Sequence, residues 1–129
     1  MTLGTDKDKL VLDTNVVIAY LAGQPAAKEA FSKREVHLSV VNEIELKCFP
    51  KLTPADIQII NIYLSRTILW SINGAIKEIA IEFRKTYRLG LADAIIAATA
   101  SVLDMPLVTQ DKDFTRLPTE LVNVILYKP

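Results

Sequence analysis

Five short runs rich in β-branched and other apolar residues alternate along this sequence with longer segments of helical spacing. The runs are 9–13 (KLVLD), 36–41 (VHLSVV), 67–72 (TILWSI), 106–109 (PLVT) and 122–127 (VNVILY). Strands that alternate with helices and are apolar on both faces are typical of a parallel sheet covered by helices on both sides. The sequence therefore predicts an α/β sandwich in which right-handed crossovers connect the strands.

Helix signals fill the gaps between these runs. Thr53 and Pro54 form a good N-cap and first helical position, and Asn73 is a second capping residue. The expected helices are 15–22, 26–34, 42–49, 54–66, 74–87 and 91–103, the last ending before Met105 and Pro106.

Length and composition limit the alternatives. The chain has 129 residues, 50% of them hydrophobic, which suits one domain over 1–129 with a polar N-terminal lead, 1–8. No apolar stretch approaches the ~20 residues of a membrane helix, so we expect a cytoplasmic protein with no membrane partner. One cysteine and one histidine exclude an internal disulfide and the usual Cys/His zinc sites.

Acidic side chains stand where a parallel sheet places its ligand sites, beyond the carboxyl ends of the strands. Each has a plain structural explanation, because aspartates commonly cap helices and occupy turns. Four separate places in one chain nevertheless favour a shared site. The acids are Asp13 after the first run, Glu43 and Glu45 after the second, Asp93 at the start of the last helix, and Asp111 and Asp113 after the fourth run.

Carboxylates held close together repel one another unless protons or cations lie among them. Oxygen ligands without His or Cys suit Mg²⁺ or Mn²⁺, which can activate water for phosphodiester hydrolysis. The net charge of zero speaks against a polyanion substrate, but four metal-bound acids would leave eleven acidic groups against fifteen basic ones. The nearest candidates for phosphate contacts are Lys85, Arg88, Lys112 and Arg116.

Four segments, LDTNVVIAY, LSVVNEIEL, LADAIIAATA and LVTQDKDF, occur in the order typical of the PIN-domain family. The chain resembles in particular the VapC-type toxins of type II toxin–antitoxin pairs. The resemblance implies a three-layer α/β/α sandwich with a central parallel sheet in the order 3-2-1-4-5. Asp13 and Asp111 would then flank the point where the strand order reverses.

The resemblance also assigns roles to residues. Asp13, Glu45, Asp93 and Asp111 match the catalytic acids that hold one or two Mg²⁺ or Mn²⁺ ions. Glu45 is preferred to Glu43, which at about 100° per helical residue points to nearly the opposite side. The residues expected to support the site are Thr14, Asn15, Thr109 and Asp113.

These features favour a metal-dependent endoribonuclease that is the toxin of a toxin–antitoxin pair and hydrolyses RNA with a metal-activated water. A catalytically silent PIN module, acting as a scaffold in RNA processing or protein binding, is the alternative. Phosphatases of the haloacid-dehalogenase class also begin with a strand ending in Asp. They need a second Asp two residues later, where this chain has Asn15.

The helix over 54–66 is apolar nearly all round, which suggests a second buried surface on a partner or on another copy of the chain. The resemblance implies a homodimer and an antitoxin protein, with DNA contacted only through that antitoxin. Trp70 is expected in the core, and Cys48 is expected to be a small buried side chain rather than a nucleophile.

Overall fold

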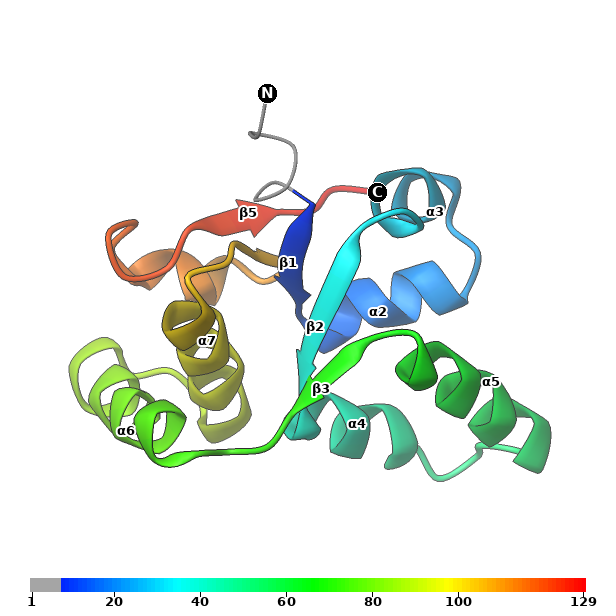
Figure 1. Cartoon of the computed structure of the whole chain (residues 1–129), viewed down its shortest axis with the longest axis horizontal. Helices are drawn as coiled ribbons and strands as arrows, with labels where there is room; N and C mark the ends of the chain where they lie inside the picture. The colour runs from blue at the N-terminus through cyan, green and yellow to red at the C-terminus, as the bar shows by residue number, and fades with distance from the viewer. Residues whose placement is uncertain (1–7) are drawn as a thin grey trace.

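The five strands form one parallel sheet in the order β3-β2-β1-β4-β5 (Figure 1). The computed structural model describes residues 8–129, so the predicted polar lead lies outside the described residues except for Asp8. The strands are β1 (Lys9–Leu12), β2 (Glu35–Ser39), β3 (Ile68–Trp70), β4 (Leu107–Thr109) and β5 (Val124–Leu126). The predicted α/β class, the parallel sheet and its strand order are confirmed.

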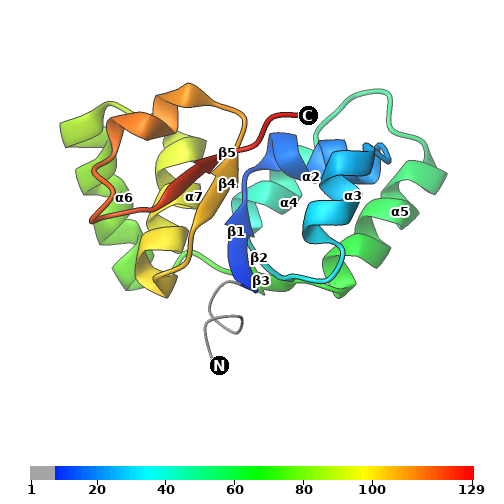
Figure 2. The ribbon, with the colours of Figure 1, turned by 90° about the horizontal axis from the view of Figure 1, so that it is seen from above.

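Helices cover both faces of this sheet, which confirms the predicted three-layer sandwich (Figure 2). On one side lie α6 (Gly74–Tyr87) and α7 (Leu91–Leu103), next to the short 3₁₀ helix η1 (Lys112–Arg116). The other side carries α2 (Thr14–Leu21), α3 (Pro25–Phe31), α4 (Val40–Lys47) and α5 (Pro54–Ser65).

The central strand β1 shows why the chain forms two cores. Successive side chains of a strand point to opposite faces. Val11 accordingly packs with α6 and α7, while Leu10 and Leu12 pack with α2 and α3. All three side chains are fully buried or nearly so, as a strand covered on both faces requires.

The Ala-rich helix α7 lies deep in the first of these cores. Ala94, Ala97, Ala98 and Ala100 are buried, and their small side chains allow the helix to approach both the sheet and α6 closely. Asp93 stands in the first turn of this helix, so the packing of α7 fixes the position of its carboxylate.

Within residues 8–129, no helix combines the length and apolarity needed to cross a membrane.

Some local expectations differ from the structure. Helix α4 begins at Val40 rather than at residue 42, because Ser39 and Asn42 form a reciprocal cap at its start. The 3₁₀ helix η1 was not expected. The prediction that Cys48 is buried is wrong, because Cys48 caps the end of α4 beyond the last buried residue, Leu46. Trp70 is only partly buried because β3 is an edge strand.

Candidate functional site

Asp13 lies at the carboxyl end of β1, where the chain turns into α2. Its backbone N–H donates to the carbonyl of Val108 on β4 at 2.9 Å, which fixes the residue between two neighbouring strands. Its side chain is buried, with 6% of its surface exposed. One carboxylate oxygen, Oδ1, accepts a hydrogen bond from the Thr14 N–H at 2.8 Å, so Asp13 is also the N-cap of α2.

Thr109 links Asp13 to the loop after β4. Its hydroxyl donates to Asp13 Oδ2 at 2.7 Å and accepts from the backbone N–H of Asp111 at 3.0 Å. Asp111 in turn accepts the N–H of Asp113 at 2.8 Å and is the N-cap of η1. Thr109 is fully buried, so this small network places the carboxylates after β1 and β4 at one edge of the sheet.

Glu45 approaches the same edge from α4. The Thr14 hydroxyl donates to Glu45 Oε1 at 2.6 Å, which joins the start of α2 to the second turn of α4. Glu43 instead pairs with Lys47 at 2.8 Å along α4. Of the two glutamates, Glu45 is therefore the one that the structure brings beside Asp13.

Asn42 is a buried member of this network that the sequence reasoning missed. Its amide nitrogen donates to the Leu12 carbonyl at 3.2 Å and to the Thr14 hydroxyl at 3.0 Å, while its amide oxygen accepts the Ser39 N–H at 2.8 Å. The sequence carried one local signal, since Asn42 follows the capping serine by three residues, but its bonds to β1 and α2 depend on tertiary structure. Asn15, which was expected, accepts the Gln110 N–H at 3.3 Å.

Asp93 faces the other carboxylates without capping its helix. The N-cap of α7 is Gly90. Burial raises the pKa of Asp93 to about 6, and the charges of Asp13, Asp111, Glu45 and Asp113 contribute to the increase. These mutual effects mean that the five predicted acids share one region of the molecule, although they come from four separate parts of the sequence.

The pKa of Asp13 is also raised above its usual range, chiefly because its carboxylate is buried. The hydrogen bonds from Thr109 and Thr14 act in the opposite direction and favour the charged form. The charges of Glu45 and Asp111 raise the pKa further. Two of the acids are thus held in an environment that disfavours their ionisation, as expected for carboxylates that a cation would stabilise.

The donor set suits a hard divalent cation, because it consists of carboxylate and hydroxyl oxygens without His or Cys. The side chains are not arranged as a finished metal site: within residues 8–129, no three His, Cys, Asp or Glu side chains surround a common point. Both oxygens of Asp13 accept hydrogen bonds from threonines. The chemistry of these ligands fits a hard divalent cation such as Mg²⁺ or Mn²⁺.

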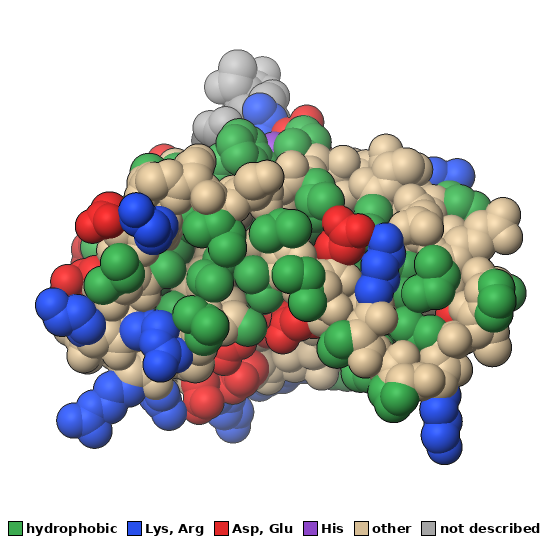
Figure 3. Space-filling model, turned by 90° about the horizontal axis from the view of Figure 1, so that it is seen from below, with side chains coloured by type: hydrophobic (Ala, Val, Ile, Leu, Met, Phe, Trp, Pro, Cys, Tyr) green, Lys and Arg blue, Asp and Glu red, His purple; other side chains and the backbone are tan. Residues whose placement is uncertain are grey.

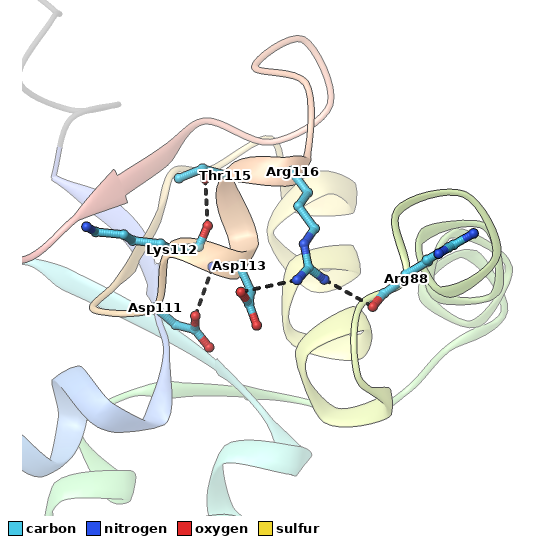
Figure 4. A network of polar contacts seen from close by, with 6 residues as sticks. All are labelled: Arg88, Asp111, Lys112, Asp113, Thr115 and Arg116. Carbon is cyan, nitrogen blue, oxygen red and sulfur yellow. Dashed lines mark hydrogen bonds and ion pairs between the residues drawn. The ribbon is translucent and has the colours of Figure 1, made fainter.

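The four basic residues considered for phosphate binding are all exposed. Arg116 contacts one of the acids, since its guanidinium donates to Asp113 Oδ1 and to the Arg88 carbonyl, each at 3.3 Å (Figure 4). In the same view the side chains of Lys112 and Arg88 extend away from Asp111 and Asp113. Lys85 lies on the last turn of α6.

The PIN domain family model matches residues 10–120. No curated protein matches the chain.

Solved structures of the same fold come from toxin–antitoxin complexes. A chain of the toxin–antitoxin complex from Klebsiella pneumoniae is 28% identical, with a TM-score of 0.77, over 90% of this chain and 95% of that one. A chain of DNA-bound VapBC from Salmonella typhimurium is 21% identical, with a TM-score of 0.79, over 92% of this chain and 97% of that one. A chain of promoter-bound VapBC2 from Rickettsia felis is 17% identical, with a TM-score of 0.79, over 93% and 99%. Since the family model spans most of the sequence, the chain belongs to the PIN-domain family.

Proposed function

We propose that this chain is a metal-dependent endoribonuclease and the toxin of a toxin–antitoxin pair. The observation that carries the proposal is the convergence of carboxylates from four parts of the chain, expressed in the raised pKa of Asp93. Membership of the PIN family and the likeness to chains of VapBC complexes support a toxin nuclease.

In this proposal Asp13, Glu45, Asp93 and Asp111 hold one or two Mg²⁺ or Mn²⁺ ions, with Asp113 as an additional candidate. A bound ion supplies Lewis acidity and a water of lowered pKa for attack on the phosphodiester. The protein's own contribution is to aim the carboxylates. Thr109 orients Asp13 by donating to Oδ2, and Asn42 orients Thr14, which donates to Glu45.

The proposed substrate is RNA, whose phosphates need positive charge near a site that is itself acidic. The candidates for these contacts are Lys85, Arg88, Lys112 and Arg116. Asn15 supports the site from the start of α2 through its bond to the Gln110 N–H.

We further propose an antitoxin protein and a second copy of the chain as partners. Exposed apolar side chains support this proposal: Ile59 and Ile62 on α5 are 53% and 46% exposed, and Ile44 on α4 is 61% exposed. A cavity of about 350 Å³ adjoins α5 and is lined in part by Ile18, Phe49 and Ile59. Figure 3 shows hydrophobic side chains gathered in the middle of the face seen from below, with charged side chains around them. Apolar areas of this kind are typical of protein interfaces.

The activity is tested by incubating the purified protein with structured and unstructured RNAs, with Mn²⁺ or with EDTA. We expect cleavage only with the metal, and a loss of at least a hundredfold in Asp13→Asn and Asp93→Asn. Glu43→Gln is the matched control, because Glu43 pairs with Lys47 and lies two residues from Glu45. This variant should cleave at the rate of the original protein.

Two other results of this assay would count against the proposed site or the proposed activity. Cleavage that survives both aspartate substitutions would exclude the proposed site. Binding of RNA without cleavage of any RNA would favour the catalytically silent scaffold. The partner proposal predicts a dimer by light scattering. It also predicts that the product of a short reading frame next to the gene co-purifies with the chain and suppresses its activity.

A further inference from the structure

A cavity of about 410 Å³ lies beside η1 and the end of α6. It is lined by Thr86, Tyr87, Arg88 and Arg116. Two of the four lining residues are arginines, and within the described contacts Arg116 also joins this cavity to the acidic site through its ion pair with Asp113. The cavity is thus a basic pocket at the border of a strongly acidic region.

The two hydrogen bonds of Arg116 hold its guanidinium in place but leave several of its N–H groups available for another acceptor. A guanidinium carries five N–H groups in a rigid fork. The described contacts of Arg116 use one nitrogen for the Arg88 carbonyl and the other for Asp113, and both bonds are long at 3.3 Å. The side chain is half exposed. Its orientation is therefore set while N–H groups remain for a further acceptor.

The two contacts could mean only that Arg116 braces η1 against the connection between α6 and α7. That connection already has a brace of its own, because Arg84 donates to the Leu89 carbonyl at 3.2 Å. Arg88 itself has a left-handed backbone (φ 56°), which turns its carbonyl toward Arg116 and its side chain away (Figure 4).

The two arginines place positive charge beside the acids. The carboxylates around Asp93 repel the phosphates of a nucleic acid, so a bound strand needs compensating charge next to the site. The charge of Asp113 contributes to the raised pKa of Asp93. Asp113, the ion-pair partner of Arg116, therefore belongs to that acidic region. Arginine suits this task, since its planar fork matches a phosphate bidentately.

We infer that Arg116, with Arg88 at the rim, forms a subsite for a phosphate of the RNA strand outside the acidic centre. This inference rests on the proposed function. It singles out Arg116 among the four basic candidates, because Arg116 pairs with Asp113 while the side chain of Lys112 extends to the opposite side. Arg116 would thereby fix the path of the strand across η1.

The test measures binding and cleavage separately. Binding of a fluorescently labelled, single-stranded RNA oligonucleotide is followed by anisotropy in EDTA at several salt concentrations. Arg116→Gln removes the charge but keeps a polar side chain at this position. We expect it to weaken binding about tenfold and to lower the salt dependence by about one phosphate contact. In cleavage with Mn²⁺, KM should rise while kcat stays within about twofold.

Lys77→Gln is the matched control, because it removes the same charge from an exposed side chain of α6 that has no place in the proposed site. It should change affinity by less than about twofold. Arg116→Lys should restore the salt dependence but only part of the affinity, since a lysine cannot bind bidentately. Thermal unfolding of all variants separates a binding effect from a loss of the brace.

An equal effect of Arg116→Gln and Lys77→Gln would overturn the inference in favour of diffuse surface charge. So would a loss of kcat or of thermal stability with unchanged binding, which would make Arg116 a structural brace. If the original protein cleaves RNA and Arg116→Gln binds normally, the subsite is wrong and the proposed function stands. If the oligonucleotide binds through Arg116 but no RNA is cleaved, the subsite stands and the nuclease proposal fails.

Discussion

Burial and the negative charges of nearby carboxylates both disfavour the charged form of Asp93. It stands in the first turn of α7, where a carboxylate normally gains from the helix dipole, yet its pKa is raised to about 6. The folded protein therefore binds a proton at Asp93 between about pH 4 and 6 that the unfolded chain has lost. Folding stability from this group is present at low pH and is lost as the pH rises through about 6.

The direction of this pH dependence of stability gives a prediction for the metal-free protein. Asp93→Asn should become more stable relative to the original chain as the pH rises from 4 to 7, with a gain of roughly 2–5 °C in Tm at pH 7. The measurement is thermal unfolding in EDTA at a series of pH values, with the exposed Glu78→Gln as control. A constant difference across this range would contradict the electrostatic account of Asp93.

Thr109 holds in place the carboxylate of Asp13, the other acid whose pKa is raised. Thr109→Val keeps the shape of a fully buried side chain but removes the hydroxyl bonded to Asp13 and Asp111. We expect a loss of about 1–3 kcal/mol in unfolding free energy and, with Mn²⁺, a cleavage rate reduced at least tenfold.

The control for this prediction is Thr99→Val. Its hydroxyl is also buried but donates to the Ile95 carbonyl within its own helix. Chemical denaturation and cleavage assays should show a smaller loss of stability and no loss of activity for Thr99→Val. Similar behaviour of both variants would mean that Thr109 acts only as a buried hydroxyl.

At the scale of the elements, Asn42 joins three of them. It bonds to the end of β1, to the start of α2 and to the cap of its own helix α4. Asn42→Ala should cost about 2–4 kcal/mol of unfolding free energy, since it leaves buried groups without partners. Asn73→Ala, which removes the cap of α6, should cost only about 1 kcal/mol. Equal losses in urea denaturation would rule out the joining role of Asn42.

The elements also show how far the sequence could be interpreted. The helix over 91–103 was predicted with the observed bounds, because Gly90 and Pro106 flank a regular apolar pattern. The strands are shorter than their apolar runs, since residues such as Val40 and Val41 are apolar but already helical. Packing, rather than local pattern, decided the exposure of Cys48 at the end of α4.

At the scale of the whole molecule, strand order places the site. β1 lies between β2 and β4, and the chain moves to opposite sides of it before and after α7. Sites in such sheets form where the order reverses. The acids could be predicted for this reason, because each follows or precedes a recognisable element. The hydrogen bond from Thr109 to Asp13 could not, since it joins residues 96 positions apart in the sequence.

The proposed activity requires these acids to bind a divalent ion together. A titration of the ¹⁵N-labelled protein with Mn²⁺, followed by NMR, tests it directly because the ion broadens nearby amide signals. We predict that the amides of Thr14, Asp93 and Asp111 broaden first and that Asp93→Asn requires at least ten times more Mn²⁺. First broadening at the exposed acids Glu78 and Glu82 on α6, or none with millimolar Mn²⁺, would contradict the claim.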